Sequence, residues 1–506
     1  MGTESKNQGR KSWVNWTIFL ITVVVVFVLG MLASTISERR VETEYVYAPK
    51  VQINDWEPRN QLWGENFPAQ YDSYMQTEEG DFKSLYNGNV MIDMLEVDPR
   101  LVVLWAGYGF SKDYNQGRGH YWAIEDLQNS LRTGGPMKAT DGPMPATCWT
   151  CKSPDVPRLM NEHGITEFYT GKWARLGPEI SNPIGCADCH NNVTMDLQIS
   201  RPALIEAFER QGRDITKATH QEMRSLVCAQ CHVEYYFNKN LPGKEGIPYL
   251  VLPWDKGMGV EGMLAYYDEI GFKDWTHKLS KAPMLKAQHP GYETWITGTH
   301  AKNGVTCADC HMPYTSEGGQ KFSDHHMQSP LNNIANSCQV CHRQSEQELK
   351  EAVFTKMESV ISQRDELEKM LVRAHAEAKH AWDNGATDEQ MKSILKLIRH
   401  AQFRWDYAAA AHGAAFHNSL ELLRVVSSGM QESQEARIEL AVLLNKIGAS
   451  YPVPYPNIET KADAQAYIGL PMEKLEAEKA KFVDEIVPQW IKEAHERENS
   501  WGVNYY

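Results

Sequence analysis

Ten cysteines carry the clearest chemical signal in this chain, because they occur only as five pairs with the spacing Cys-x-x-Cys. In four pairs a histidine directly follows the second cysteine. Cys-x-x-Cys-His is the attachment motif of c-type haem, in which both thiols bind the porphyrin and the adjacent imidazole can bind its iron. The four motifs are Cys186/Cys189 with His190, Cys228/Cys231 with His232, Cys307/Cys310 with His311, and Cys338/Cys341 with His342.

Structural disulfides, zinc knuckles and a thioredoxin-like redox pair are the alternative interpretations of this spacing. A single Cys-x-x-Cys-His could arise by chance, but four of them use eight of the ten cysteines. Zinc sites would not require a histidine at the same following position each time. The sequence therefore predicts covalent haem at all four motifs.

The fifth pair departs from the pattern and reads Cys148-Trp149-Thr150-Cys151-Lys152. It could be a degenerate motif or a disulfide. Alternatively, it attaches a fifth haem with Lys152 as the proximal ligand. A lysine amine donates to a metal only when neutral, so the site must lower its pKa or the iron must displace its proton. A different proximal ligand would make this iron the natural place for an open coordination position and for catalysis.

Histidines are numerous enough to supply the second axial ligands of four haems. The chain has 18, and fourteen remain when the four motif histidines are set aside. Spacing alone does not select among them. We expect solvated surface positions for a group in highly charged helical stretches, namely His375, His380, His400 and His495.

An uncharged segment at residues 14–36 precedes all of these motifs. As a helix it would span roughly 34 Å, enough to cross a bilayer core. Lys6, Arg10 and Lys11 lie before it, which predicts that the N-terminus stays in the cytoplasm and the remainder is exported. A cleaved signal peptide is the alternative, although residues 32–36 lack an Ala-x-Ala cleavage pattern. We favour an uncleaved anchor.

The rest of the chain is expected to be mainly α-helical with little β structure. Composition excludes wholesale disorder, and a net charge of −14 without a long basic run argues against nucleic-acid binding. Beyond His342, apolar residues recur at helical spacing as far as Asn384-Gly385, and further helices are predicted at 387–426, 431–447 and 472–497, the last interrupted at Pro488. These long C-terminal helices would form a bundle or a dimer interface.

Three regions follow from these patterns. Residues 1–37 are the cytoplasmic tail and membrane anchor, or the signal. Residues 38–345 are expected to be the catalytic region, pentahaem if the Cys148/Cys151 pair also attaches a haem. Residues 346–506 are a helical region that we expect to form the dimer interface.

Four Cys-x-x-Cys-His motifs together with one Cys-x-x-Cys-Lys resemble the pentahaem cytochrome c nitrite reductases that form ammonia. The resemblance covers most of the chain after the anchor and implies their multihaem cytochrome c fold. Four further strings support it: Arg118-Gly119-His120, His232-Val233-Glu234-Tyr235-Tyr236, Lys286-Ala287-Gln288-His289-Pro290, and His412-Gly413 followed by His417.

The resemblance implies roles for individual residues. Lys152 would bind the iron of the active-site haem, and Arg132, Tyr235 and His289 would line the nitrite pocket. Calcium beside this pocket would be bound by the side chains of Glu234 and Gln288 and the backbone carbonyls of Tyr235 and Lys286. The distal haem ligands would be His120 for the Cys228/Cys231 haem, His325 for Cys186/Cys189, His417 for Cys307/Cys310, and His300 for Cys338/Cys341. Two neighbours compete for these roles, His326 beside His325 and His412 before His417.

The implied activity is the six-electron reduction of nitrite to ammonium on the periplasmic side of the cytoplasmic membrane. Five covalent haems and calcium are the implied cofactors. A homodimer and a membrane-bound, quinol-oxidising tetrahaem cytochrome are the implied partners. An electron conduit without a substrate, or a related reductase of hydroxylamine or sulfite, are the alternatives. Lys152 argues against the conduit, which would need only histidine-ligated haems.

Overall fold

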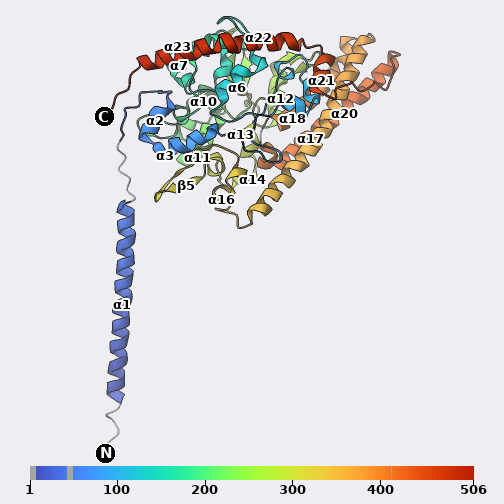
Figure 1. The fold of residues 1–506 in the computed structure, drawn as a ribbon. Coiled ribbons are helices and arrows are strands. Elements are labelled where there is room, and N and C mark those ends of the chain that lie inside the picture. The colour runs from blue at the N-terminus through green and yellow to red at the C-terminus, as the bar shows by residue number, and fades with distance from the viewer. Residues whose placement is uncertain (1–6, 43–48, 412) are drawn as a thin grey trace, which may run out of the picture.

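The structure is a computed structural model that describes residues 7–42, 49–411 and 413–506. Helix α1 (Asn7–Glu42) extends away from the rest of the molecule (Figure 1). Within α1, Ser12–Ile36 has a mean hydropathy of 2.7 and no buried residue. It is the one helix in the described ranges that is long and apolar enough to cross a membrane, which fits either an anchor or a signal sequence.

The region that carries the cysteine pairs is built from short helices joined by irregular segments. Its α-helices are α2 (Asn60–Asn66), α3 (Pro68–Met75), α4 (Met94–Val97), α5 (Arg100–Leu104), α6 (Ala123–Asn129), α7 (Asp155–His163), α8 (Ile165–Phe168), α9 (Cys186–Cys189), α10 (Pro202–Arg210), α11 (His220–Ala229), α12 (Val260–Glu269), α13 (Gly291–Ile296), α14 (Thr299–Lys302), α15 (Cys307–His311) and α16 (Ile334–Ser337). Its 3-10 helices are η1 (Gln76–Glu78), η2 (Gly109–Ser111), η3 (Leu131–Thr133), η4 (Ala146–Trp149), η5 (Trp173–Glu179), η6 (Ile215–Lys217) and η7 (Pro330–Asn332).

Strands are few and short, as expected from the sequence. They form three two-stranded antiparallel sheets: β1 (Tyr236–Asn238) with β2 (Tyr249–Val251), β3 (Trp275–Thr276) with β4 (Pro283–Met284), and β5 (Tyr314–Glu317) with β6 (Gln320–Ser323). In the first sheet Tyr236 pairs with Val251 and Asn238 with Tyr249. This sheet begins directly after the Glu234-Tyr235 segment, which itself follows the Cys228/Cys231 motif.

Long helices dominate the C-terminal region. They are α17 (Glu346–Asp383), α18 (Asp388–Ala410), α19 (Ala414–His417), α20 (Ser419–Lys446), α21 (Lys461–Tyr467), α22 (Met472–Glu485) and α23 (Val487–Ser500). Helix α17 begins at a capping box in which Ser345 and Glu348 exchange hydrogen bonds. Helices α17, α18 and α20 pack together on one side of the molecule, and α22 and α23 cross the top of it in the view of Figure 1.

The structure confirms the long helix that the sequence places up to Asn384 and the interruption near Pro488, and it corrects the helices between them. The predicted helices 387–426 and 431–447 are wrong: α18 ends at Ala410, and α20 runs unbroken from Ser419 to Lys446. The break has a local cause, because Gly413 adopts a left-handed conformation (φ +78°) and Asn418 caps the N-terminus of α20.

One large apolar core joins the haem region to the C-terminal helices. It extends from Leu95 to Trp490, and the indole rings of Trp105 and Trp405 meet in it at 5.6 Å between centroids. A smaller cluster packs Val51 and Trp63 against Ala187 of α9. Because residues on both sides of position 345 share the larger core, the haem region is supported by the C-terminal helices.

Candidate functional site

The cysteine pairs lie in or directly after short helical turns, which accounts for their spacing: two lie on α9 and α15, two at the C-terminal ends of η4 and α11, and one in the turn after α16. Residues three apart on a helix lie on the same face, so both thiols of a pair can reach one porphyrin edge. Two of these turns have acidic caps: Asp188 accepts a hydrogen bond from the Gly185 N–H (2.8 Å), and Asp309 accepts one from the Thr306 N–H (2.7 Å). All ten thiols are free of disulfide bonds, including those of Cys148 and Cys151.

Cys341 differs from the other cysteines in its burial. The sequence assigns all ten alike to haem attachment, but Cys341 is exposed to solvent, whereas the other nine are partly buried. The reason is local, because the turn that follows α16 lies at the surface. Its backbone is closed by a hydrogen bond from the His342 N–H to the Cys338 carbonyl (2.9 Å), and the adjacent Val340 is 69% exposed. This pair therefore lies at the edge of the haem region, and attachment through Cys341 stays a prediction.

Four pairs of imidazole rings face each other at nearly identical separations. Two imidazoles bound to opposite sides of one metal ion, with metal–nitrogen bonds of about 2 Å, would have ring centroids roughly 6 Å apart. The observed centroid distances are 6.2 Å for His120 and His232, 6.3 Å for His190 and His325, 6.2 Å for His300 and His342, and 6.3 Å for His311 and His417. Each pair joins one motif histidine to one histidine from elsewhere in the chain.

Hydrogen bonds at Nδ1 prepare several of these rings to bind a metal through Nε2. A backbone carbonyl accepts the Nδ1 proton, so the lone pair lies on Nε2. These bonds join His190 to Met195 (2.8 Å), His311 to Gln328 (2.9 Å) and His325 to Ser323 (2.7 Å). Burial lowers the pKa of His120 and of His325 to about 4 and that of His417 to about 3. The rings therefore stay neutral, with a nitrogen lone pair available to a metal.

Two histidines are alternatives to the predicted distal ligands, His326 to His325 and His412 to His417. His325, and not its neighbour His326, faces His190; the His326 N–H instead donates to the Asp324 carboxylate (2.9 Å). His412, the alternative to His417, lies outside the described residues.

The four histidines expected at solvated positions do not behave alike. His495 is exposed, as expected. His375 is completely buried, so that expectation is wrong for it; its imidazole stacks on that of His277 with centroids 3.6 Å apart. His400 is partly buried and contacts Asp268 at 2.7 Å, and His380 is also partly buried. The prediction rests on the many charged residues of α17, but His375 lies on the buried face of this helix.

Two of the three predicted pocket residues, Arg132 and Tyr235, lie near the fifth cysteine pair together with Lys152. Burial raises the pKa of the Cys148 thiol to about 12, against the opposing influence of the nearby Arg132 and Lys152 cations. Burial also raises the pKa of Tyr235 well above its ordinary value, and the adjacent Cys151 and Cys148 add to this shift. Arg132, Lys152 and Tyr235 therefore share one environment around this pair, although they come from three separate segments.

Arg132 is held in place by its own short helix. Its backbone N–H (3.2 Å) and its Nε (3.0 Å) both donate to the hydroxyl of Ser130, which caps η3. The guanidinium lies over the ring of Phe110, 4.4 Å from its centroid. A cation stacked on an aromatic face keeps its charge while losing side-chain freedom, so Arg132 is fixed before any anion arrives.

His289 lies next to the histidine of the Cys228/Cys231 motif. Its ring meets that of His232 edge to face, with centroids 4.5 Å apart. The structure also adds Tyr108, which the sequence does not single out. Burial raises the pKa of Tyr108 well above its ordinary value, and its other influences include Gln288, Cys148 and Arg132. Its only sequence signal is its place between two glycines, Gly107 and Gly109.

Three of the four residues predicted to bind calcium, Glu234, Gln288 and Lys286, are joined by hydrogen bonds beside this pocket. The Glu234 side chain is fully buried and accepts hydrogen bonds from the Gln288 N–H (2.5 Å) and the Tyr267 hydroxyl (3.0 Å). The Gln288 side chain donates to the Lys286 carbonyl (3.2 Å). Burial raises the pKa of Glu234, and the nearby carboxylates of Glu293 and Asp274 raise it further. So many buried carboxylate oxygens suit a hard cation.

A buried ion pair holds the side chain of Lys286. The Lys286 Nζ donates to Asp406 Oδ1 (2.7 Å) and to the Ala287 carbonyl (2.5 Å). Both charged side chains are almost inaccessible to solvent. Asp406 lies on α18, so a C-terminal helix fixes the segment that leads to Gln288 and His289. Sequence spacing gave no indication of this contact.

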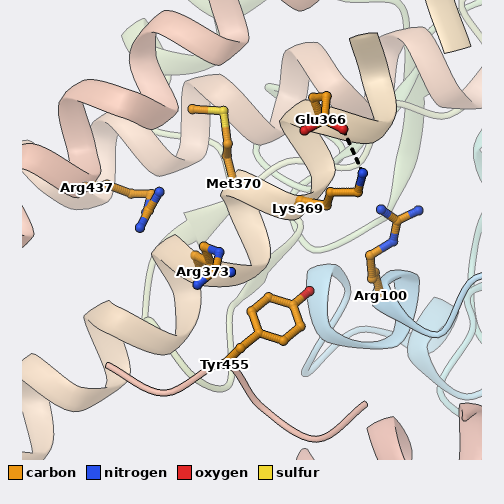
Figure 2. A pocket seen from close by; sticks show the side chains of 7 residues that line it. All are labelled: Arg100, Glu366, Lys369, Met370, Arg373, Arg437 and Tyr455. Atoms are coloured by element: carbon orange, nitrogen blue, oxygen red, sulfur yellow. Dashed lines mark hydrogen bonds and ion pairs between the residues drawn. The ribbon is translucent and has the colours of Figure 1, made fainter. Parts of the chain in front are cut away.

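A separate cavity of about 460 Å³ lies away from all of these residues (Figure 2). It is lined by Arg100, Glu366, Lys369, Met370, Arg373, Arg437 and Tyr455. Three of its four cations already contact carboxylates: Arg100 with Glu368 (2.8 Å), Lys369 with Glu366 (2.7 Å) and Arg437 with Glu377 (2.8 Å). Its cations are thus largely neutralised within the chain, and no predicted site residue lines it.

Comparisons with known proteins show what the whole chain is similar to. The family model described as cytochrome c552 matches residues 59–499. Cytochrome c-552 of Parabacteroides distasonis is 57% identical over 96% of this chain and 97% of its own length, and that of Bacteroides fragilis is 56% identical with the same coverage. A solved cytochrome c nitrite reductase from Desulfovibrio desulfuricans, described as a catalytic subunit with two calcium sites, has a TM-score of 0.72 and 31% identity, covering 84% of this chain and 91% of that one.

Proposed function

The chain belongs to the cytochrome c552 family, and we propose that it reduces nitrite to ammonium at a haem bound by Cys148 and Cys151. The observation that carries this proposal is the contrast between the five cysteine pairs. Four have a motif histidine with a second imidazole facing it at 6.2–6.3 Å, whereas the fifth has Lys152 beside Arg132 and Tyr235. Four sites are suited to electron transfer and one is suited to a substrate.

The four imidazole pairs would give haems with both axial positions filled. An iron with two protein ligands has no position for a substrate, so its role is to pass electrons. The cysteine pairs also adjoin one another: Cys231 affects the pKa of Cys151, Cys307 that of Cys228, and Cys338 that of Cys310. This contiguity supports a continuous route for electrons to the fifth site.

The haem iron, when bound, supplies an electrophilic coordination position and the electrons. The residues around it supply charge and protons. The Arg132 guanidinium is oriented to hold the oxygen atoms of an anion through paired N–H donors. Tyr235 and His289 carry the exchangeable protons that must reach these oxygens as each N–O bond breaks. A cationic pocket is also needed to attract nitrite to a chain of net charge −14.

Calcium would bind beside this pocket and fix the segments that carry its residues. We assign Glu234 and Gln288 as side-chain ligands, and Tyr235 and Lys286 as carbonyl ligands. Two of these residues adjoin or belong to the pocket, since Tyr235 is a pocket residue and Gln288 precedes His289. A calcium ion would compensate the charge of the buried Glu234 carboxylate and so offset the cost of burying it. The same ion would hold the segments of both proton donors, Tyr235 and His289, in place.

The proposed location is the periplasmic side of the cytoplasmic membrane, with α1 as an uncleaved anchor. Its exposed apolar surface and the preceding basic residues support this orientation. A membrane quinol-oxidising tetrahaem cytochrome is the proposed donor, and the C-terminal helices are the proposed homodimer interface. Retention in membranes through salt and carbonate washing tests the anchor. A soluble mature protein that starts near Ser37 would show a cleaved signal instead.

A steady-state assay with reduced viologen tests the activity most directly. Nitrite, hydroxylamine and sulfite are offered separately to the haem-loaded enzyme, and ammonium is measured as the product of the first two. We expect nitrite to be reduced to ammonium with the highest kcat/KM. Oxidation of viologen by none of the three would support an electron conduit, and a clear preference for sulfite or hydroxylamine would support a related reductase.

A further inference from the structure

A buried lysine from a C-terminal helix contacts the segment that carries Arg132. Lys479 lies on α22, and its side chain is only 6% exposed. Its Nζ donates to the Gln128 carbonyl (2.9 Å) and to the Thr133 hydroxyl (2.8 Å). Within the described residues it forms no ion pair. Burial lowers its pKa to about 7, a shift that Asp113 opposes.

The two acceptors lie on either side of Arg132. Gln128 belongs to the last turn of α6, and Thr133 ends η3. The Thr133 hydroxyl also contacts the Ser130 carbonyl (2.9 Å), and the Ser130 hydroxyl accepts the hydrogen bonds of Arg132 described above. A single line of contacts therefore leads from Lys479 through Thr133 and Ser130 to the guanidinium.

The backbone of α22 also presses against this segment. A Cβ added at Gly135 would lie 2.1 Å from the Glu478 carbonyl oxygen, so only glycine permits this approach. The amine of Lys479 thus reaches its acceptors from a helix that is itself in contact with the loop. Burying a lysine amine without a carboxylate partner is costly, and a methionine of similar size would fill the same space without that cost. The hydrogen bonds to the Arg132 segment give this amine a specific role.

We propose that Lys479 is a positioning residue for Arg132, and that α22 thereby sets the affinity of the pocket for an anionic substrate. This inference rests on the proposed function, in which Arg132 holds the oxygens of nitrite. If the segment from Gln128 to Thr133 loosens, the guanidinium loses its fixed direction. An anion should then bind less tightly, whereas an uncharged substrate should be affected little.

The test uses the haem-loaded enzyme with Lys479→Met, and with Lys481→Met as the matched control on the exposed face of the same helix. Near neutral pH nitrite is an anion and hydroxylamine is mostly uncharged. We expect Lys479→Met to lower kcat/KM for nitrite about tenfold and that for hydroxylamine less than about twofold. Lys481→Met should change neither value. Lys479→Arg keeps N–H donors at this position and should stay within about threefold of the parent for nitrite.

A double-mutant cycle separates positioning from general destabilisation. In an Arg132→Ala background, Lys479→Met should cause no further loss for nitrite, because it acts through the missing guanidinium. Additive losses, equal losses for both substrates, or an unchanged nitrite kcat/KM would each overturn the proposal.

Amide hydrogen exchange supplies a readout that does not depend on turnover. Exchange in residues 128–135 should be faster in Lys479→Met than in the parent and in Lys481→Met, while exchange in α9 and α15 should not change. Unchanged exchange in residues 128–135 would refute the positioning role. An enzyme that reduces no nitrite would instead refute the proposed function and leave this exchange result standing.

Discussion

The imidazole rings of His311 and His417 face each other with centroids 6.3 Å apart, although one comes from the haem region and the other from the C-terminal helices. His311 ends α15 in the Cys307/Cys310 motif, and His417 ends α19, a single turn between α18 and α20. An uninterrupted C-terminal helix would not provide this turn. The break at Gly413 and the cap at Asn418 therefore decide where an axial ligand of this site lies.

The first prediction concerns the number of haems. We expect five covalent haems per chain by pyridine haemochrome, and four in a Cys148→Ser, Cys151→Ser double variant, because these thiols form no disulfide and are available for attachment. A count of four in both the parent protein and this variant would show that Lys152 belongs to no haem site, and the proposed active site would be lost.

The second prediction separates two adjacent histidines. His325→Ala should convert one low-spin haem to high spin in electron paramagnetic resonance, because His325 faces His190 at 6.3 Å. His326→Ala is the matched control and should leave all four low-spin signals in place. The opposite result would move the ligand by one residue.

The third prediction concerns Lys152. Lys152→His creates a fifth Cys-x-x-Cys-His, so haem should still attach and the total should stay at five. We expect nitrite turnover to fall by at least about 100-fold, since imidazole changes the electronics and the position of the iron. Arg132→Ala should weaken nitrite binding without altering the haem ligand. Parental turnover in Lys152→His would make lysine ligation incidental.

The fourth prediction concerns calcium. Glu234→Gln should remove calcium, as measured by elemental analysis, and lower nitrite turnover about tenfold or more while five haems remain, because the pocket loses the cation that orders Tyr235 and His289. Glu245→Gln, which changes an exposed carboxylate, is the control. If calcium content were the same in both variants, Glu234 would not be a ligand.

The fifth prediction concerns pH and stability. His375 is buried, its Nδ1 contacts the Ser280 hydroxyl (2.9 Å) and its Nε2 the Gln402 carbonyl oxygen (2.6 Å). Burial lowers its pKa from an ordinary 6.5 to about 4. Between these values the unfolded chain binds more protons than the folded one, so the free energy of unfolding should fall as pH falls from 6.5 to 4, by up to about 3 kcal/mol from this residue.

The measurement is chemical denaturation followed by circular dichroism at several pH values. His375→Gln should reduce the loss of stability on acidification relative to the parent, because the buried group no longer titrates. His380→Gln, on the same helix but nearer the surface, should keep the parental pH dependence. Equal pH dependence in the two variants would show that His375 does not contribute.

The sequence by itself determined the elements whose signals are local. Cysteine spacing identifies the five pairs, continuous hydropathy identifies α1, and helical periodicity identifies α17 up to Asn384. Each of these depends on residues within one turn or one helix of each other. The mainly helical class with little β structure follows from the same local patterns and is what the structure has.

Only the tertiary structure decided which distant residues meet and which side chains reach the surface. The buried position of His375, the exposed position of Cys341 and the interruption that creates α19 are not visible in periodicity, because each depends on what packs against the segment. The same is true of Asp406 beneath Lys286 and of Lys479 against Thr133. Contacts between segments far apart in the chain depend on how those segments pack in one shared core. Local sequence patterns such as spacing and periodicity therefore do not predict them.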